Sequence, residues 1–281
     1  MNQITEETFE RLLRSFIGAE QIDLRSVSFI DPYGMLGLLE IGELCMLEDV
    51  KKTILLPNAG EVCTYLSRMN FFPHAKRYFS FDEQCAGAAK TNSKSDSDVL
   101  LEITPIERSN DIHHIVGVVR DRAQAILARH LHYDDRAING FIVALSEVCQ
   151  NIIEHSENKG FVGIQKYRYQ SLNKNIVKIA VMDVGVGFRK SLSARFRLKS
   201  DLDAIDKALL HGASRYEDEG RGHGLAGVRK FVTQWQGKLS IRSGTARLAI
   251  IPSWARGKPQ ERGLTKFPGA QINIILPEVV K

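Results

Sequence analysis

The sequence predicts an α/β (α+β) protein with two domains, on the strength of three observations. Segments with strand-like and helix-like patterns alternate along the chain. The length of 281 residues corresponds to about two domains of roughly 100–200 residues each. A small, polar and aperiodic segment lies between the two halves. We therefore predict a first domain at residues 1–83, a linker at 84–98 and a second domain at 99–281.

The composition excludes several classes of protein. It is 43% hydrophobic and 25% charged, as in soluble globular proteins. No apolar stretch approaches the ~18–20 residues of a membrane span. The first residues lack the basic and apolar regions of a signal peptide. The 4 cysteines are widely spaced and form no C-x-x-C pair, which argues against a zinc site. We expect a cytoplasmic protein that does not contact membranes.

The first domain is predicted to hold a parallel sheet, because strands and helices alternate within it. Strands are expected at Val27–Ile30 and Thr53–Leu56, and helices at Thr5–Phe16, from Pro32 onward, and through Val62, Leu66 and Met69. Pro32 suits the first position of a helix, and the Asp31 side chain can cap its free amides.

In the second domain the most regular pattern lies at residues 138–153, where apolar side chains recur at close to the helical period. Further helices are predicted at Ile112–His132, Ala204–Leu210 and Val228–Trp235, and strands at Val99–Ile106, Val162–Tyr169, Ile176–Met182, Leu239–Arg242, Leu248–Ile251 and Gln271–Leu276. Residues Trp254–Phe267 are interpreted as an insertion before the last strand.

Three motifs that carry chemistry follow one another in this domain. The first comprises Glu147, Asn151 and His155, whose spacing of four places them along one ridge of the predicted helix. A carboxylate and an amide one turn apart can share a cation or orient a water molecule. Taken alone, the triplet is explained better by a solvated helix face.

The second motif is Asp183-Val184-Gly185-Val186-Gly187, directly after an apolar strand. Two glycines let the backbone approach a flat ligand, and the carboxylate can accept a hydrogen bond from an exocyclic amine. The third runs from Gly220 to Gly227 before a helix, whose first amides can hold phosphate oxygens. An ordinary turn would explain either motif on its own. The dinucleotide fingerprint is excluded for the third, because no strand directly precedes it.

The order and separation of the three motifs resemble those of the GHKL (Bergerat-fold) ATPases, the superfamily of DNA gyrase, heat-shock chaperones, mismatch-repair ATPases and histidine kinases. Residues 147–155 correspond to the N box of that family, 183–187 to the first glycine box and 220–227 to the second. The resemblance covers about residues 99–276. It implies that the C-terminal domain is a Bergerat-fold α/β sandwich that binds ATP with Mg²⁺.

The resemblance also implies a role for each matching residue. Asn151 would bind Mg²⁺, and Asp183 would accept a hydrogen bond from the adenine amino group. Glu147 occupies the position of the general base, which suits a carboxylate near the γ-phosphate. Two sets complete the nucleotide site: Gly185 and Gly187, which would shape the pocket, and Gly220, Gly222, His223, Gly224, Leu225 and Gly227 of the second glycine box. His155 is expected to support the helix rather than to do chemistry.

Within the superfamily the domain resembles anti-sigma-factor serine kinases. No phosphoacceptor motif of sensor histidine kinases surrounds His113 and His114. Residues Leu24–Leu39 resemble the STAS domain of anti-sigma-factor antagonists. At Pro32 and Tyr33, however, the aliphatic hydroxyls that such domains phosphorylate are missing. The first domain is therefore interpreted as a degenerate STAS-like domain that docks an ATPase domain without being its substrate.

These resemblances imply an ATP-binding regulatory protein that closes a lid at Ala213–Gly222 to control, or phosphorylate, a protein partner. The partner would be a STAS-type or sigma-factor-like regulator, and homodimerisation is left open; no nucleic-acid partner is expected. We lean toward an enzyme, either an ATPase or a serine/threonine kinase. The alternatives are a nucleotide-gated binding module without significant turnover and a chaperone-like ATPase.

The net charge of +5 is local rather than global. Residues 242–266 hold six basic side chains and one acidic one, an excess that equals that of the whole chain. Most of this run lies in the predicted insertion at residues 252–268. We interpret it as a solvated loop, with a docking surface for an acidic partner as the alternative.

Overall fold

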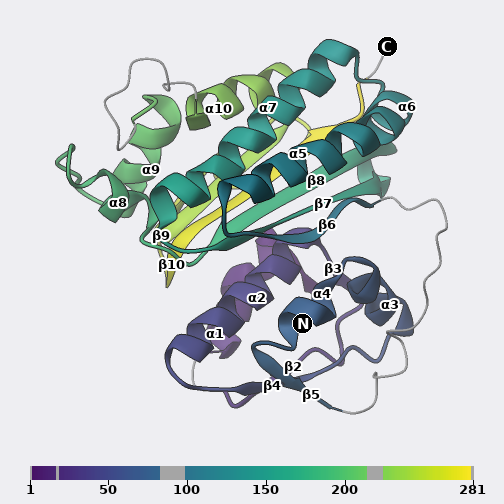
Figure 1. Cartoon of the computed structure of the whole chain (residues 1–281), viewed down its shortest axis with the longest axis vertical. Helices are drawn as coiled ribbons and strands as arrows, with labels where there is room; N and C mark the ends of the chain where they lie inside the picture. Colours follow the sequence, from purple (N-terminus) through teal and green to yellow (C-terminus); the bar gives the residue numbers. More distant parts are fainter. Residues whose placement is uncertain (1, 17–18, 83–98, 214–223, 280–281) are drawn as a thin grey trace.

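The computed structural model describes residues 2–16, 19–82, 99–213 and 224–279. A five-stranded antiparallel sheet, in the order β6-β7-β8-β10-β9, lies at the centre of the molecule. Long helices cover one face of this sheet, and the N-terminal region (residues 2–82) covers the other (Figure 1). Among the described residues, no helix combines the length and apolar character needed to cross a membrane.

The strands of the N-terminal region pair in parallel, as their alternation with helices predicted, but they form two small sheets rather than one. One pairs β1 (Gln3–Ile4) with β3 (Phe29–Ile30), and the other has the order β2-β4-β5. The remaining elements of this region are η1 (Glu6–Thr8), α1 (Phe9–Phe16), β2 (Gln21–Asp23), α2 (Pro32–Leu47), β4 (Lys52–Leu55), α3 (Gly60–Arg68), α4 (Phe71–Ala75) and β5 (Phe79–Phe81). The predicted linker at 84–98 lies outside the described residues, so the division into domains stays a prediction.

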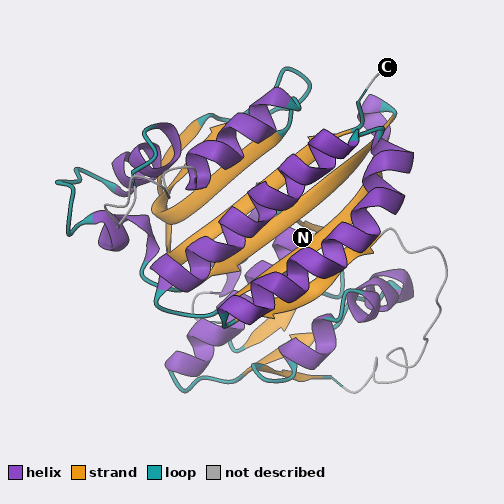
Figure 2. Ribbon diagram, turned by 45° about the horizontal axis from the view of Figure 1, so that its top comes forward, coloured by secondary structure: helices purple, strands orange, loops and turns teal. Residues whose placement is uncertain are grey.

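The C-terminal region (residues 99–279) carries the large sheet and its helices. The strands are β6 (Val99–Ile106), β7 (Gly160–Tyr169), β8 (Lys174–Asp183), β9 (Lys238–Ile250) and β10 (Gln260–Pro277). The helices are α5 (Ser109–Ala123), η4 (Gln124–Ala128), α6 (Arg129–Leu131), α7 (Asp135–Asn151), η5 (Ile152–Ser156), η6 (Gln170–Leu172), α8 (Gly187–Leu192), α9 (Asp201–Leu210) and α10 (Gly224–Gln234). Figure 2 shows α5, α7 and α10 side by side across the strands.

Both faces of the large sheet are buried, each in a different hydrophobic core. Because side chains alternate along a strand, Val177, Ile179 and Val181 of β8 pack under the helices. Ala180 and Met182 point the other way, into a core shared with the N-terminal region. An antiparallel sheet commonly leaves one face to solvent. Here that face is the one that the N-terminal region covers.

Two predictions about the end of the chain are wrong. The predicted strands at Leu239–Arg242 and Leu248–Ile251 are parts of one strand, β9, which continues through Gly244. The predicted insertion at Trp254–Phe267 overlaps β10, which begins at Gln260 and pairs with Leu248 of β9. The basic run therefore lies largely on a long β-hairpin rather than in a solvated loop.

Helix α2 lies between the two regions, packed against β7 and β8. Asp31 caps it as predicted, since its carboxylate accepts a hydrogen bond from the Gly34 amide at 3.0 Å. The other carboxylate oxygen accepts one from Lys178 Nζ of β8 at 2.8 Å. Both charges are largely removed from water, so each depends on its partner across the interface.

Glu40 of α2 is a charged residue in an unfavourable place. Its side chain is fully buried, and neither carboxylate oxygen has a hydrogen-bond partner among the described residues. Burial, together with the nearby Glu43 and Asp183 carboxylates, raises the pKa of Glu40 well above its usual value. The folded protein therefore holds this side chain as a neutral acid at pH values where the unfolded chain is ionised.

We expect Glu40→Leu to raise the free energy of unfolding at neutral pH by about 1–3 kcal/mol, the usual cost of an unsatisfied buried polar group. When the pH is below the ordinary pKa of a glutamate, the Glu40 carboxyl is protonated in both the folded and the unfolded state, so its titration does not lower stability. As the pH rises toward its folded pKa, only the unfolded state ionises, so stability falls. Urea denaturation at several pH values should show a shallower decline in the variant.

Glu43→Leu is the matched control for this prediction. Glu43 lies one turn further along α2, accepts a hydrogen bond from Tyr78 Oη at 3.3 Å and pairs with Lys159 at 3.7 Å. Its removal should lower stability because both partners lose a contact. A stabilising Glu43→Leu, or a destabilising Glu40→Leu, would contradict the contrast between the two carboxylates.

Candidate functional site

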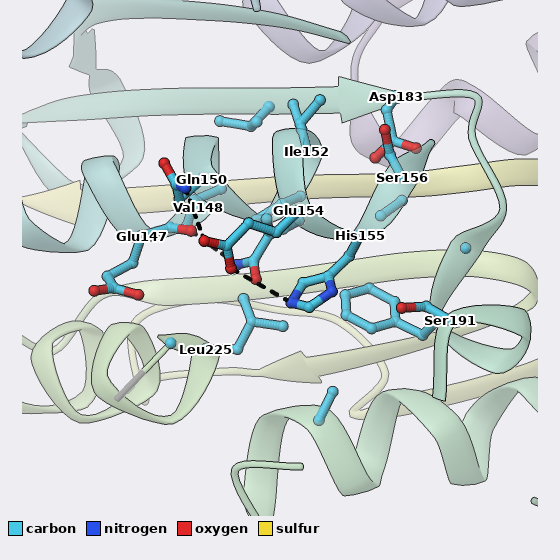
Figure 3. Close-up of a pocket in the computed structure, with 18 of the residues that line it drawn as sticks. Glu147, Val148, Gln150, Ile152, Glu154, His155, Ser156, Asp183, Ser191 and Leu225 are labelled. Carbon is cyan, nitrogen blue, oxygen red and sulfur yellow. Dashed lines mark hydrogen bonds and ion pairs between the residues drawn. The ribbon is translucent and has the colours of Figure 1, made fainter. Parts of the chain in front are cut away.

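A pocket opens between the end of β8 and the helices that cover one face of the large sheet. Its walls come from α7, η5, α8, α9, α10 and the middle of β10. Glu147 and Asp183 both line it, and Figure 3 shows Glu147 at the left of the pocket and Asp183 at the upper right. The pocket thus brings together parts of all three motifs that the sequence singled out.

Helix α7 supplies the first wall. Glu147, Asn151 and His155 all line the pocket, as their spacing predicted. The Asn151 amide nitrogen donates to the backbone oxygen of Glu147, one turn earlier, at 2.9 Å. This contact uses the donor side of the amide, so the side-chain oxygen is the atom left to meet a ligand. The helix then widens into the π-helical turn η5, a distortion frequent at functional sites.

Asp183 is the last residue of β8, and its side chain is nearly fully buried, with 4% exposed. The carboxylate accepts hydrogen bonds from the backbone amides of Gly185, at 2.8 Å, and Ala270. Burial raises the pKa of Asp183 from 3.8 to about 7, despite these two hydrogen bonds. A buried carboxyl with such a pKa, lining a pocket, is typical of a binding or catalytic site.

The first glycine box holds the loop after Asp183 close to the rest of the site. Gly185 does not line the pocket itself; a side chain there would collide with the backbone oxygen of Ser156. The Val186 amide donates to that same oxygen at 2.8 Å, which ties the loop to η5. Gly187 lines the pocket and has a φ of +70°, a conformation that glycine adopts most readily.

The second glycine box is described only from Gly224 onward. Gly224 and Leu225 line the pocket, and both belong to the first turn of α10. Gly227 lies within the same helix, beyond the lining residues. Gly220, Gly222 and His223 lie outside the described residues, as does the predicted lid apart from Ala213.

Several residues of the pocket were not predicted. Phe188 and Ser191 belong to α8, a helix of 6 residues that is too short to show a helical period in the sequence. Glu154 enters the pocket from η5, where it accepts a hydrogen bond from Gln150 at 2.8 Å and lies 4.0 Å from His155 (Figure 3). A polar cluster thus lies between the two ends of the pocket.

A comparison with known families bears on this geometry. Residues 138–277 match the family described as histidine kinase-, DNA gyrase B-, and HSP90-like ATPase. This part of the chain is a GHKL-type ATPase domain. The matched residues of the ATPase domain begin in α7 and end with β10, so they include every described residue of the three motifs. No curated protein was found to match the chain.

The match implies ATP binding, usually together with Mg²⁺. The residues of the ATPase domain fit that pair of ligands. Asn151 offers an oxygen of the kind that Mg²⁺ prefers, and its amide is already oriented by Glu147. Among the described residues, no group of three or more acidic, His or Cys side chains gathers to hold a metal. A cation at Asn151 would therefore need the phosphate oxygens as further ligands, as Mg²⁺ sites with nucleotides commonly do.

Proposed function

We propose that the protein is a nucleotide-dependent regulator of the anti-sigma-factor kinase type. Mg·ATP binds in the pocket, with adenine against Asp183 and the phosphates toward Glu147 and Asn151. The observation that carries this proposal is the pairing of a buried carboxylate at one end of the pocket with a carboxylate and an oriented amide at the other. ATP supplies the phosphoryl group, and the chain supplies its binding and orientation.

Glu147 is the residue that we assign to the chemical step. It lines the pocket from α7 and lies one turn before Asn151. There a carboxylate can accept the proton of a water molecule or of a partner's serine hydroxyl as that oxygen attacks phosphorus. The second glycine box, at the start of α10, would hold phosphate oxygens on its backbone amides.

The substrate of such a kinase would be a separate protein. In the N-terminal region, Pro32 and Tyr33 occupy the positions where STAS domains carry their hydroxyls, and Tyr33 is 2% exposed. Burial raises the pKa of the Tyr33 phenol far above its usual value. Asp31, next to them, is tied to Lys178 of the large sheet. This segment therefore suits a docked STAS-like domain that is not phosphorylated, with a STAS-type or sigma-factor-like partner outside the chain.

Incubation of the purified protein with Mg·ATP tests the proposal. Release of ADP, or transfer of phosphate to an added STAS-type protein, should occur in the wild type and vanish in Glu147→Ala. Tight binding of ATP that stays intact would exclude catalysis and favour a nucleotide-gated binding module. Absence of nucleotide binding would contradict the proposal altogether.

The pH dependence of binding tests the role of Asp183 separately. Its carboxyl, with a pKa of about 7, must lose a proton to become a full acceptor for the adenine amino group. We expect the affinity for adenosine, which has no phosphate to titrate, to rise as the pH passes through this value. Below it the gain should approach roughly tenfold per pH unit. Competition binding should show a flat profile in Asp183→Asn, and a flat wild-type profile would contradict the assignment.

A further inference from the structure

A chain of hydrogen bonds connects the N-terminal region to the nucleotide pocket. Glu10 of α1 accepts a hydrogen bond from Arg242 Nε of β9 at 2.8 Å. Arg242 Nη1 donates to Gln271 Oε1 of β10 at 3.3 Å. Gln271 Nε2 then donates to the backbone oxygen of Asp183 at 3.2 Å. The last three residues are almost completely buried, so water does not compete for these contacts.

The N-terminal region supplies the ion-pair partner of Arg242 and part of its packing. Its guanidinium lies 5.8 Å from the ring centroid of Phe9, a residue of α1, and 5.6 Å from that of Phe267. Glu10, also on α1, forms the ion pair with it. An arginine with 2% exposure keeps its charge and is costly to leave uncompensated. Backbone oxygens of Gly244 and Thr265 also accept hydrogen bonds from Arg242. Undocking of α1 would leave these contacts but remove the only carboxylate that pairs with the guanidinium among the described residues.

Arg242 in turn fixes which way Gln271 faces. A guanidinium can only donate hydrogen bonds, so the amide oxygen of Gln271 must point toward it. The amide nitrogen then points the other way, toward the backbone oxygens of Asp183 and, at 2.7 Å, of Pro268. Gln271 thereby contacts both the end of β8 and the irregular stretch of β10 at residues 268–270, where the pairing with β9 shifts register.

The same stretch of β10 contacts the Asp183 side chain. Ala270, next to Gln271, donates its amide to the Asp183 carboxylate. Strand β9 also contacts Gly269, because Ser243 Oγ donates a hydrogen bond to the Gly269 backbone oxygen at 2.6 Å. A displacement of β9 at Arg242 and Ser243 would thus reach both the backbone and the carboxylate of Asp183.

We propose that Arg242 and Gln271 are positioning residues through which docking of the N-terminal region sets the nucleotide affinity of the ATPase domain. The inference rests on the proposed function, in that Asp183 binds the adenine. Coupling of this kind is reciprocal, so bound nucleotide also strengthens the docking of α1 by the same factor. A partner that competes for α1 or for this face of the sheet would therefore weaken ATP binding.

Three variants of the full chain test the proposal. Gln271→Glu keeps an oxygen for Arg242 but removes the donor to Asp183, and Glu10→Gln removes the charge that holds Arg242. Glu6→Gln is the matched control. Glu6 also forms buried contacts across the interface, to Lys238, Arg247 and Asn273. Within the described part of the chain, no side-chain hydrogen bond or ion pair of these three residues leads to Asp183.

The first measurement is the affinity for a non-hydrolysable Mg·ATP analogue, by calorimetry. We expect it to fall about fivefold to tenfold in Gln271→Glu and Glu10→Gln and to stay unchanged in Glu6→Gln, although the control also loses stability. Unchanged affinity in Gln271→Glu would overturn the proposal. An equal loss in Glu6→Gln would do the same, because it would mean that general loosening of the interface is the cause.

The second measurement needs no ligand. Hydrogen exchange of the Gly185 amide, which donates to the Asp183 carboxylate, should be faster in Gln271→Glu and Glu10→Gln and unaltered in Glu6→Gln. If the wild type fails to bind nucleotide, the proposed function is wrong, and exchange alone decides whether these residues position Asp183. Unaltered exchange in both variants overturns the positioning role even where nucleotide binds.

Discussion

Asp183→Asn is expected to weaken the binding of Mg·ATP analogues by roughly a hundredfold, since hydrogen bonds to a buried charged group contribute strongly to affinity. In the wild type the carboxylate only accepts hydrogen bonds once it is ionised, and the adenine amino group only donates them. Asparagine would turn a donor toward that amine or would lose its contact with the Gly185 amide. Calorimetric titration of the purified variant measures the effect.

The same variant should differ from the wild type in how its stability depends on pH. The pKa of Asp183 is raised from 3.8 to about 7. Its titration therefore stabilises the folded state fully below pH 3.8, and this contribution to the free energy of unfolding is lost as the pH rises toward 7. Asparagine does not titrate, so this part of the decline should disappear. Asp183→Asn would therefore weaken nucleotide binding while it keeps the protein folded near neutral pH, a combination common at binding sites.

Glu147→Gln is the matched control for Asp183→Asn, since it makes the same chemical change at the other end of the pocket. It should leave the affinity for the nucleotide nearly unaltered, because Glu147 is assigned to the attacking oxygen and not to adenine. Equal losses of affinity in the two variants would contradict the orientation of the nucleotide that we propose. Wild-type affinity in Asp183→Asn would exclude adenine from this end of the pocket.

The parts of the fold that follow a local period could be predicted from the sequence. The apolar residues that recur at residues 138–153 lie mostly in helix α7. Strand β6 has the bounds that its pattern predicted. Asp31 caps α2 because capping depends only on neighbouring residues. The N box could also be predicted from local spacing, because a helix places every fourth residue on one side and its three polar residues line the pocket.

Short or distorted elements escaped prediction, for a physical reason. Strand β1 has 2 residues and α8 has 6, which is too few to show a period. The π-helical turn η5 breaks the helical period at the place where Glu154 enters the pocket. Such elements are stabilised by tertiary contacts rather than by local propensity, so their neighbours along the chain carry little information about them.

The basic run shows a second limit of sequence reasoning. The sequence favours a solvated loop for most of the basic run at residues 242–266, which includes Arg242 and Arg247, because charged side chains are seldom buried. Their partners, Glu10 and Glu6, lie more than 230 residues earlier in the chain. No local pattern connects residues so far apart. For Arg242 and Arg247, the acidic partners are therefore carboxylates of the same chain rather than of another protein.

Glu6→Ala is expected to lower the free energy of unfolding by about 3–5 kcal/mol, the usual loss when one member of a buried ion pair is removed. Glu6 is 3% exposed and meets three partners of the large sheet. Its carboxylate accepts from Lys238 Nζ at 2.9 Å, Asn273 Nδ2 at 2.7 Å and Arg247 Nη1 at 3.2 Å. The variant would leave Lys238, with 6% exposure, in a site that has lost most of its negative charge. Denaturation by urea measures the change.

Asp23→Ala is the control for Glu6→Ala, because it removes an acidic partner from an exposed ion pair of the same region. Asp23 and Arg25 lie 2.7 Å apart, but more than half of each side chain is exposed, at 52% and 56%. Water replaces such a pair at little cost, so stability should hardly change. Hydrogen exchange should also rise in β1 and η1 of Glu6→Ala and not in Asp23→Ala. Equal effects of the two variants would mean that the buried pairs do not hold the N-terminal region against the sheet.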